Sequence, residues 1–329
     1  MNELTTVQQN TAIAERQTVG AELFNRYIDF LDSSPKTVET YTRALRQLFS
    51  YFSLNGITQP TRADILAFRD ELKASGHKPT TVQNYITATK IFFSWTEQEG
   101  LYPNVADHLK GAKLDREHKK DYLTSRQVKE VLAGVDRSTE QGLRDYAMLF
   151  LMVTGGLRTI EVSRANIGDL RTLGDNSVLY VQGKGREEKT DYIKLSAPAE
   201  QAIRAYLKAR GEKDEEAPLF SSTSNNNRGA RLTTRSVSGI VKTRLQQAGY
   251  DSEKLTAHSL RHTAVTLSLL AGKDITEVQQ FARHANIATT MIYNHALDKA
   301  KNGCSEAITQ AIMGLYTAQH THIHSLLAV

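Results

Sequence analysis

Two basic pairs and one tyrosine in the last quarter of the chain have the types and spacing needed for chemistry at a phosphate. His258 and Arg261 stand three residues apart at the expected start of a helix, Arg283 and His284 follow about one helix later, and Tyr293 comes nine residues after His284. An attacked phosphodiester gathers negative charge, which arginine matches with two parallel hydrogen bonds from a group that stays protonated. On a helix, residues three apart share a face, and free N–H groups at the helix start also favour an anion. The pattern predicts a site that holds a phosphate while the Tyr293 phenol attacks it.

A plain structural role is open to each of these side chains when it is taken alone. A phenol has an ordinary pKa near 10, so a tyrosine attacks a phosphate only with help from neighbouring cations or a base. Tyr293, beside Ile292, would otherwise be a core aromatic, and each histidine would be a surface or core residue. The chemical interpretation therefore needs further charged residues elsewhere in the chain.

Arg158 and Glu161 form a second charged cluster, in the stretch TGGLRTIEV. An apolar helix expected over 139–154 ends at Gly155-Gly156, after which Arg158 opens a new helical turn and Glu161 follows three residues later. Because an apolar helix lies behind Arg158 and a glycine turn precedes it, we expect this arginine to be held in place rather than solvated.

A third piece is the stretch VLYVQGKGREEKTDYIKL, residues 178–195. Its β-branched and aromatic residues predict two strands on either side of Gly183-Lys184-Gly185, which is typical of a β-hairpin. At the tip of such a hairpin, Lys184 could reach a phosphate or protonate a leaving oxygen.

In this order along the chain, the motifs resemble those of the tyrosine recombinase (phage integrase) family. TGGLRTIEV is similar to the family's first arginine box, HSLRHTAVTLSLLAG to its second, and the segment from Phe281 to His295 to its histidine-to-tyrosine box. The resemblance covers about 122–300. The chain departs from the family pattern at Arg283, where a glycine usually precedes the last histidine. One interpretation of Arg283 is an additional phosphate contact.

The resemblance implies a role for each residue of the site. Tyr293 would be the nucleophile and would form a 3′-phosphotyrosyl link to DNA, while Arg158 and Arg261 would hold the scissile phosphate. By the same resemblance, the other roles are general acid for the 5′-hydroxyl leaving group (Lys184), assistance of proton transfer (His258), a hydrogen bond to the phosphate (His284) and orientation of the first arginine (Glu161). A phosphotyrosine link conserves the phosphodiester energy, so no metal, ATP or other cofactor is expected.

The implied activity is site-specific recombination of double-stranded DNA, with strand exchange through a Holliday junction in a tetrameric synapse. The free protein would be a monomer or weak oligomer, and accessory DNA-bending or directionality proteins would join on DNA. The segment before the first helix is too short for a separate arm-binding domain, which favours an Xer-like two-domain layout. The resemblance also implies that the C-terminal tail docks on a neighbouring protomer.

The expected fold is mostly α with a small antiparallel β-sheet. A length of 329 residues suggests two domains. Helical periodicity predicts four helices over roughly 20–100, which the resemblance makes a SAM-like core-binding domain, followed by a mixed α/β catalytic domain. The expected boundaries are a flexible tail (1–17), the core-binding domain (18–102), a basic linker (103–121), the catalytic domain (122–316) and a C-terminal tail (317–329).

Two of the expected N-terminal helices have similar sequences, SPKTVETYTRALRQLFSYF and KPTTVQNYITATKIFFSWT. Each has Thr-Val, then tyrosine, then a late aromatic cluster. This similarity fits either a repeated helical hairpin or two helices with the same amphipathic geometry. Polar and basic residues in these helices are candidate contacts to the DNA backbone, which would position the duplex without reading its sequence. They are Lys36, Thr37, Arg43, Lys78, Thr80, Thr81, Asn84 and Lys90.

Composition agrees with a nucleic-acid partner without demanding one. The net charge is +5 and the sequence pI about 9.1. Cys304, the single cysteine, excludes a disulfide framework and is expected to be buried or half-buried. His320, His322 and His324 alternate, but no carboxylate or cysteine accompanies them, which disfavours a metal site. No apolar leader or long apolar run occurs, so we expect a cytoplasmic, nucleoid-associated protein without membrane contact.

Three other functions share part of this pattern. A type IB topoisomerase shares the tyrosine chemistry but relaxes supercoils as a monomer; the four-helix domain and the C-terminal helix favour recombination. A DNA-binding relative without catalysis is disfavoured because every catalytic position of the family is filled. A helical regulator with these motifs by chance is disfavoured by the number of spaced matches.

Overall fold

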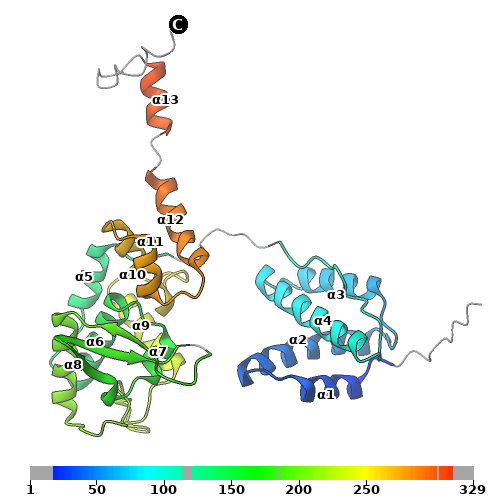
Figure 1. Cartoon of the computed structure of the whole chain (residues 1–329), viewed down its shortest axis with the longest axis horizontal. Coiled ribbons are helices and arrows are strands. Elements are labelled where there is room, and N and C mark those ends of the chain that lie inside the picture. Colours follow the sequence, from blue (N-terminus) through cyan, green and yellow to red (C-terminus); the bar gives the residue numbers. More distant parts are fainter. Residues whose placement is uncertain (1–17, 114–120, 184, 302–303, 314–329) are drawn as a thin grey trace, which may run out of the picture. The chain divides into compact units, whose positions relative to one another are not determined.

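The computed structural model of the chain describes residues 18–113, 121–183, 185–301 and 304–313, and of 295–301 the backbone alone. The chain divides into two units, Met1–Arg116 and Glu117–Val329 (Figure 1). The predicted fold class is confirmed: both units consist mainly of helices, and the second also contains a small antiparallel sheet.

Four helices form the N-terminal unit, as the periodicity predicted. They are α1 (Ala21–Phe30), α2 (Pro35–Leu54), α3 (Arg62–Ala74) and α4 (Pro79–Gln98). Local sequence explains where they begin. Proline occupies the first turn of α2 and of α4, where its missing N–H costs nothing. The Ser34 hydroxyl caps α2 by accepting from the Thr37 N–H, and Thr61 with Asp64 forms a capping box on α3.

Aromatic side chains dominate the core between these helices. Tyr27 and Phe92 meet edge to face with ring centroids 5.3 Å apart, and Phe92 packs on Phe93 at 5.1 Å. All three are essentially inaccessible to solvent. Rings in this geometry add a specific attraction to the free energy of burial, which makes this cluster the main support of the unit.

The first part of the segment expected as a linker, 103–121, packs on this core. Ala106 and Leu109 are buried among the apolar side chains of the N-terminal helices. The Arg69 guanidinium on α3 donates to the Lys110 carbonyl at 3.2 Å. Two buried apolar side chains thus attach the first part of this stretch to the N-terminal helices. The division between the two units correspondingly falls later, at 116–117.

The C-terminal unit contains nine described α-helices and one three-stranded sheet. The helices are α5 (Ser125–Ala133), α6 (Glu140–Thr154), α7 (Thr159–Arg164), α8 (Ala197–Arg210), α9 (Thr234–Gln247), α10 (Ala257–Leu270), α11 (Ile275–Ala282), α12 (Ile287–Lys301) and α13 (Cys304–Ile312). The strands, in sheet order, are β1 (Leu170–Leu173), β2 (Asn176–Val181) and β3 (Asp191–Lys194). Helices α10, α11 and α12 pack against one another (Figure 1).

The predicted hairpin is present, with a longer connection than its glycines suggested. β2 and β3 pair antiparallel, with Val178 opposite Lys194 and Val181 opposite Asp191. The connection runs from Gln182 to Thr190, and Lys184 lies outside the described residues. The hairpin therefore presents a loop rather than a tight turn.

Helix α6 is the central support of the catalytic unit. Most of its inward apolar side chains, including Met148 and Met152, are fully buried. Asp145, also buried, accepts from Arg144 at 2.7 Å and from Arg244 on α9 at 2.5 Å. A buried carboxylate shared by two guanidinium groups satisfies charges that would otherwise be costly to desolvate. These contacts tie the first half of α6 to α9.

Helix α13 buries none of its described side chains. Cys304, at its start, is exposed, so the expectation of a buried or half-buried cysteine is wrong. The reason is that no described element packs closely enough on α13 to bury its side chains. The tail at 317–329, with its three alternate histidines, and the tail at 1–17 lie outside the described residues. Within the part of the chain that the structure describes, no helix is long and apolar enough to cross a membrane.

Candidate active site

The glycine turn after α6 directs a backbone carbonyl into the site. Gly156 has a φ of +58°, in the left-handed region that favours glycine. A Cβ at this position would stand 3.1 Å from the ring of Phe281, so the close packing also requires glycine. The Gly156 carbonyl accepts from Arg261 Nη1 at 2.6 Å and from Arg283 Nη2 at 3.1 Å. The turn thus joins two arginines that lie more than 100 residues further along the chain.

Arg158 follows this turn as the N-cap of α7 and is held by Glu161, as the sequence suggested. Its Nη1 donates to Glu161 Oε1 at 2.8 Å, and its backbone N–H donates to Glu161 Oε2 at 2.8 Å. The Arg158 side chain keeps 28% of its exposure, whereas Glu161 is fully buried. Arg158 is therefore held in place by Glu161 while part of its side chain stays open to solvent.

Glu161 remains ionised in spite of its burial. Burial by itself raises the pKa of this carboxyl group. The nearby charge of Arg283, the hydrogen bond from the Arg158 backbone and the Arg158 charge outweigh burial and hold the Glu161 pKa below its ordinary value. A permanent carboxylate is what the two arginines need as a common anchor.

Arg261 on α10 is the most deeply buried cation of the site. Its side chain is 1% exposed, and its guanidinium donates to the carbonyls of Gly156 and Ala282. Burial, and then the charge of Arg158, lower its pKa to about 9, which still leaves it charged at neutral pH. A capping box of Thr256 and Ser259 begins α10 at the expected residue and so sets the turn on which Arg261 lies.

Arg283 ends α11 in the left-handed conformation, with a φ of +51°. Its guanidinium donates to Glu161 Oε2 at 2.9 Å and to the Phe281 carbonyl at 2.9 Å. Only 9% of the side chain is exposed. Internal acceptors thus engage the Arg283 guanidinium in this structure, and an additional phosphate contact from Arg283 stays a prediction.

His284 lies next to Arg283 with its ring held by α12. Its Nδ1 is 2.9 Å from the Thr290 hydroxyl, and Thr290 is fully buried. This contact fixes the ring orientation with Nε2 on the opposite edge. Burial, followed by the charges of Arg261, Arg158 and Arg283, lowers the His284 pKa to about 4, so the ring is neutral at pH 7. Thr290 was not singled out from the sequence, although its position six residues after His284 could have suggested it.

Tyr293 on α12 lies in an apolar pocket beside the cations. It is 7% exposed and belongs to a small buried cluster formed by Val265, Leu269, Val278 and Ala282. Burial raises the pKa of its phenol to about 12, although the charges of Arg261 and Arg158 act in the opposite direction. The phenol is protonated at neutral pH, so its use as a nucleophile requires a proton acceptor.

His262 is a site residue that sequence reasoning missed. It is 5% exposed, and its ring centroid lies 5.1 Å from that of Tyr293 and 4.5 Å from that of His258. His258 itself is exposed on α10. Because residues four apart on a helix are neighbours, the spacing of His258 and His262 could have predicted this contact. His262 thus links the exposed histidine to the tyrosine.

The structure brings six of the seven predicted catalytic residues into one site. Charges of Arg158 and Arg261 act on both Tyr293 and His284, and His258 also acts on His284. Lys184, the seventh, lies outside the described residues. Its neighbour Gly183 accepts from Arg164 Nη1 on α7 at 3.2 Å, which ties the base of its loop to the helix that Arg158 begins.

The arrangement suits an anion. Three guanidinium groups, those of Arg158, Arg261 and Arg283, share the single carboxylate of Glu161. An excess of fixed positive charge in a partly desolvated site stabilises developing negative charge strongly. Among the described residues, no group of histidine, cysteine, aspartate or glutamate side chains could hold a metal ion. The site can therefore bind an oxyanion beside a buried phenol through its own side chains.

Acid should weaken the catalytic unit through His284. The unfolded chain binds the His284 proton near pH 6.5 and the folded chain only near pH 4, so this group costs stability as pH falls between those values. His284→Gln, which cannot be protonated, should lose less stability from pH 7 to 4 than the wild type. Urea unfolding should be followed by circular dichroism, because the single tryptophan, Trp95, belongs to the N-terminal unit. Parallel pH dependences in the two proteins would contradict the buried, neutral histidine.

The predicted DNA contacts of the N-terminal unit are all accessible. Lys36 and Arg43 are exposed on α2, where both form ion pairs with Glu39 at 2.6 and 2.7 Å. The others are at least partly exposed and are located at the first turn of α2 or on α4: Thr37, Lys78, Thr80, Thr81, Asn84 and Lys90. Their accessibility permits DNA contact without testing it.

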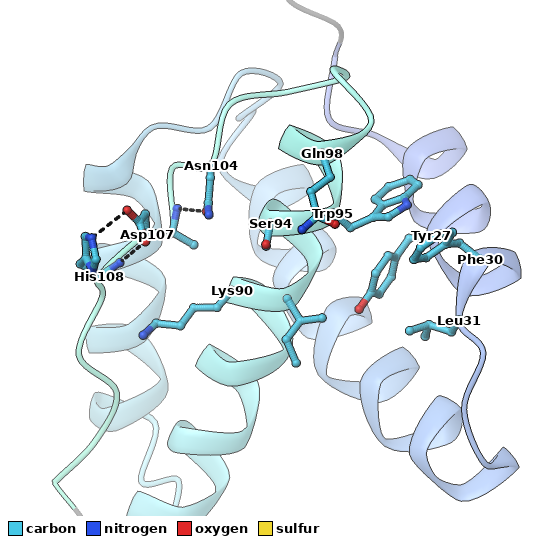
Figure 2. Close-up of a pocket in the computed structure, with 12 residues that line it drawn as sticks. Tyr27, Phe30, Leu31, Lys90, Ser94, Trp95, Gln98, Asn104, Asp107 and His108 are labelled. Atoms are coloured by element: carbon cyan, nitrogen blue, oxygen red, sulfur yellow. Dashed lines mark hydrogen bonds and ion pairs between the residues drawn. The ribbon is translucent and has the colours of Figure 1, made fainter.

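The N-terminal unit also contains a groove of about 500 Å³. Figure 2 shows aromatic side chains, among them Tyr27 and Trp95, on one side and Lys90, Asp107 and His108 on the other. The groove contains none of the residues of the candidate active site. Its volume therefore does not mark the reacting centre, which lies in the other unit.

Two family models match the chain in agreement with this division. The phage integrase family matches residues 121–300, and the phage integrase N-terminal SAM-like domain matches residues 22–100. Among curated relatives, tyrosine recombinase XerC of Herpetosiphon aurantiacus is 31% identical, over 79% of this chain and 84% of the relative. Tyrosine recombinase XerA of Pyrococcus horikoshii is 32% identical, over 85% of this chain and 93% of the relative.

Solved structures show the same fold at lower identity. The XerH site-specific recombinase in a post-cleavage complex with palindromic difH substrate has a TM-score of 0.67 and 22% identity, covering 80% of this chain and 79% of XerH. A lambda integrase (75–356) dimer bound to a COC′ core site has a TM-score of 0.67 and 17% identity, covering 83% of this chain and 97% of that chain.

Proposed function

This chain belongs to the phage integrase family as a tyrosine-type site-specific DNA recombinase, and we propose that it cleaves and rejoins DNA through Tyr293. The observation that carries the proposal is the buried Tyr293 phenol beside Arg158 and Arg261, which both act on it electrostatically. A phosphate bound by these two arginines would lie within reach of the phenol. This is the arrangement that attack on a phosphodiester requires.

In the proposed reaction, Tyr293 Oη attacks the scissile phosphorus and the bond to the 5′-oxygen breaks. The product is a 3′-phosphotyrosyl link and a free 5′-hydroxyl group. Arg158 and Arg261 neutralise the charge that develops on the non-bridging oxygens, and His284 donates a hydrogen bond to one of them. Glu161 holds Arg158 in place. Religation is the reverse reaction, in which a 5′-hydroxyl attacks the phosphotyrosine.

Two protons must move in this reaction. The phenol must lose its proton, and His258 assists this transfer at the exposed end of the histidine pair that reaches Tyr293. The leaving 5′-oxygen must gain a proton, which Lys184 on the β2–β3 loop supplies as general acid. The energy of the phosphodiester is conserved in the phosphotyrosine, so neither a metal ion nor ATP is required.

The remaining parts of the proposal concern partners. The partly exposed polar and basic residues of α2 and α4 contact the DNA backbone. Strand exchange proceeds through a Holliday junction in a homo-tetramer on DNA, with accessory DNA-bending or directionality proteins. The C-terminal tail docks on a neighbouring protomer. The protein works in the cytoplasm, in association with the nucleoid.

Covalent trapping tests the proposal. The protein is mixed, in EDTA, with nicked suicide duplexes made from its own element's ends or from pooled genomic fragments. Cleavage next to the nick releases a short fragment, so the intermediate cannot religate. We expect a covalent band on a denaturing gel that carries the 5′ label of the cleaved strand, and mass spectrometry should locate the nucleotide on the Tyr293 peptide.

Two results would contradict the proposal. A band that disappears in EDTA would show that cleavage needs a metal ion. A band with the label on the other side of the break would show a 5′-phosphate link. A supercoiled-plasmid assay adds a further distinction, since relaxation without any Holliday junction would favour a topoisomerase-like activity.

A further inference from the structure

Arg283 occupies a backbone position that is unfavourable for an arginine. Its φ of +51° lies in the left-handed region, which glycine adopts freely and side chains with a Cβ adopt at a cost. Of the described non-glycine residues, only His108 shares a positive φ. In the family pattern noted above, this position is usually glycine. The arginine must therefore make contacts that compensate for its backbone.

Those contacts all converge on the support of Arg158. The Arg283 guanidinium donates to Glu161 Oε2 at 2.9 Å and to the Gly156 carbonyl at 3.1 Å. The Arg283 backbone carbonyl accepts from Arg158 Nη2 at 3.2 Å. Glu161 is thus held between two arginines, one on each carboxylate oxygen. Arg158 in turn is held both by Glu161 and by the backbone of Arg283.

We propose that Arg283 is a positioning residue of the recombination reaction, which fixes Glu161 and, through it, aims Arg158 at the scissile phosphate. The inference rests on the proposed function. In this arrangement 91% of the Arg283 side chain is covered and its terminal nitrogens donate to internal acceptors, so its contacts serve to hold those acceptors in place. Arg283 therefore links the end of α11 to the first turn of α7.

The link has an electrostatic consequence that can be measured. After burial, the charge of Arg283 has the largest effect on the Glu161 pKa, and it lowers this pKa. Removing Arg283 should raise the Glu161 pKa, and protonation would release Arg158 from its anchor. As the pH is lowered, the variant should therefore lose cleavage activity at a higher pH than the wild type does.

The first test uses the free protein and needs no DNA. Glutamate labelled with ¹³C at the carboxyl group is followed by NMR during titration, and the Glu161 signal is assigned by its loss in Glu161→Gln. We expect the Glu161 pKa to rise in Arg283→Gly and to stay low in Arg283→Lys, which keeps the charge. Glycine suits the left-handed backbone, so this variant should fold.

The second test measures cleavage of the nicked suicide duplex in a single turnover. Arg283→Gly should slow cleavage by up to about 100-fold, as expected for a displaced catalytic group. The acidic limb of its pH profile should also move to higher pH. In a Glu161→Gln background, Arg283→Gly should have no further effect on that limb. Arg204→Ala, which removes an exposed arginine–glutamate pair on α8, is the matched control and should change neither quantity.

Two results would overturn the inference. One is a Glu161 pKa that is the same in Arg283→Gly and in the wild type. The other is a loss of about 0.9 from the slope of log affinity against log salt on uncleavable duplex, which would identify Arg283 as a direct phosphate contact. A wild-type protein that never forms the covalent band would count against the proposed function. The NMR titration would still show whether Arg283 lowers the Glu161 pKa.

Discussion

Tyr293→Phe is expected to abolish the covalent protein–DNA band while leaving folding and DNA binding intact. The substitution removes the oxygen that we propose as the nucleophile and leaves the rest of the site unchanged. The phenylalanine ring keeps the packing against Val265, Leu269, Val278 and Ala282, so the small cluster around the tyrosine should persist. The measurement is denaturing gel electrophoresis of the suicide-duplex reaction, together with a binding curve on intact duplex.

A matched control for this substitution is Tyr27→Phe. Tyr27 is also fully buried, and its hydroxyl has no hydrogen-bond partner among the described residues, so its removal should cost little. The control should form the band at the wild-type level. A band of normal intensity from Tyr293→Phe would assign the nucleophile to another residue and would refute the central element of the proposed mechanism.

Arg158→Ala is expected to have the second largest effect on catalysis. Arg158 is held by Glu161 through its backbone N–H and its guanidinium, and its side chain stays partly exposed. Both features place it to stabilise the charge that develops on the phosphate. Loss of one such donor typically costs about 2.7–4 kcal/mol of transition-state stabilisation, or about 10²- to 10³-fold in rate. Single-turnover cleavage at saturating protein should show the decrease, whereas binding of intact duplex should change far less.

Arg158→Lys distinguishes charge from geometry at the same position. Lysine keeps the positive charge but lacks the planar fork that bonds Glu161 and a phosphate together. Its cleavage rate should therefore fall between those of the wild type and Arg158→Ala. The fold should survive both changes, because Arg283 remains as a partner for Glu161. If Arg158→Ala cleaved as fast as the wild type, Arg158 would have no role at the phosphate.

Local sequence predicted the elements of this protein and the identities of its reactive groups. The glycine pair after α6 stands where the helix was expected to end, and local capping residues, Thr124 and Thr256, begin α5 and α10. These features depend on neighbours three or four residues away, which a sequence displays directly. The motif order was distinctive enough for the family and its fold to follow.

Surface or core position was harder to predict for charged side chains. The sequence suggested an additional phosphate contact for Arg283 and gave no sign of its internal partners, Gly156 and Glu161. His262 attracted no attention, yet it is buried against Tyr293. In both cases the deciding contact belongs to a different helix or turn, so no local pattern displays it.

By itself, the sequence determined the helices, the hairpin strands and the set of residues able to hold and attack a phosphate. Tertiary structure decided which of them support the others. Arg158 meets the Arg283 carbonyl 125 residues away, and Arg261 meets the Gly156 carbonyl 105 residues away. Such contacts arise only when α6, α10 and α11 pack together. The same packing buries Arg283 beside the Glu161 carboxylate and leaves the Arg158 side chain partly exposed.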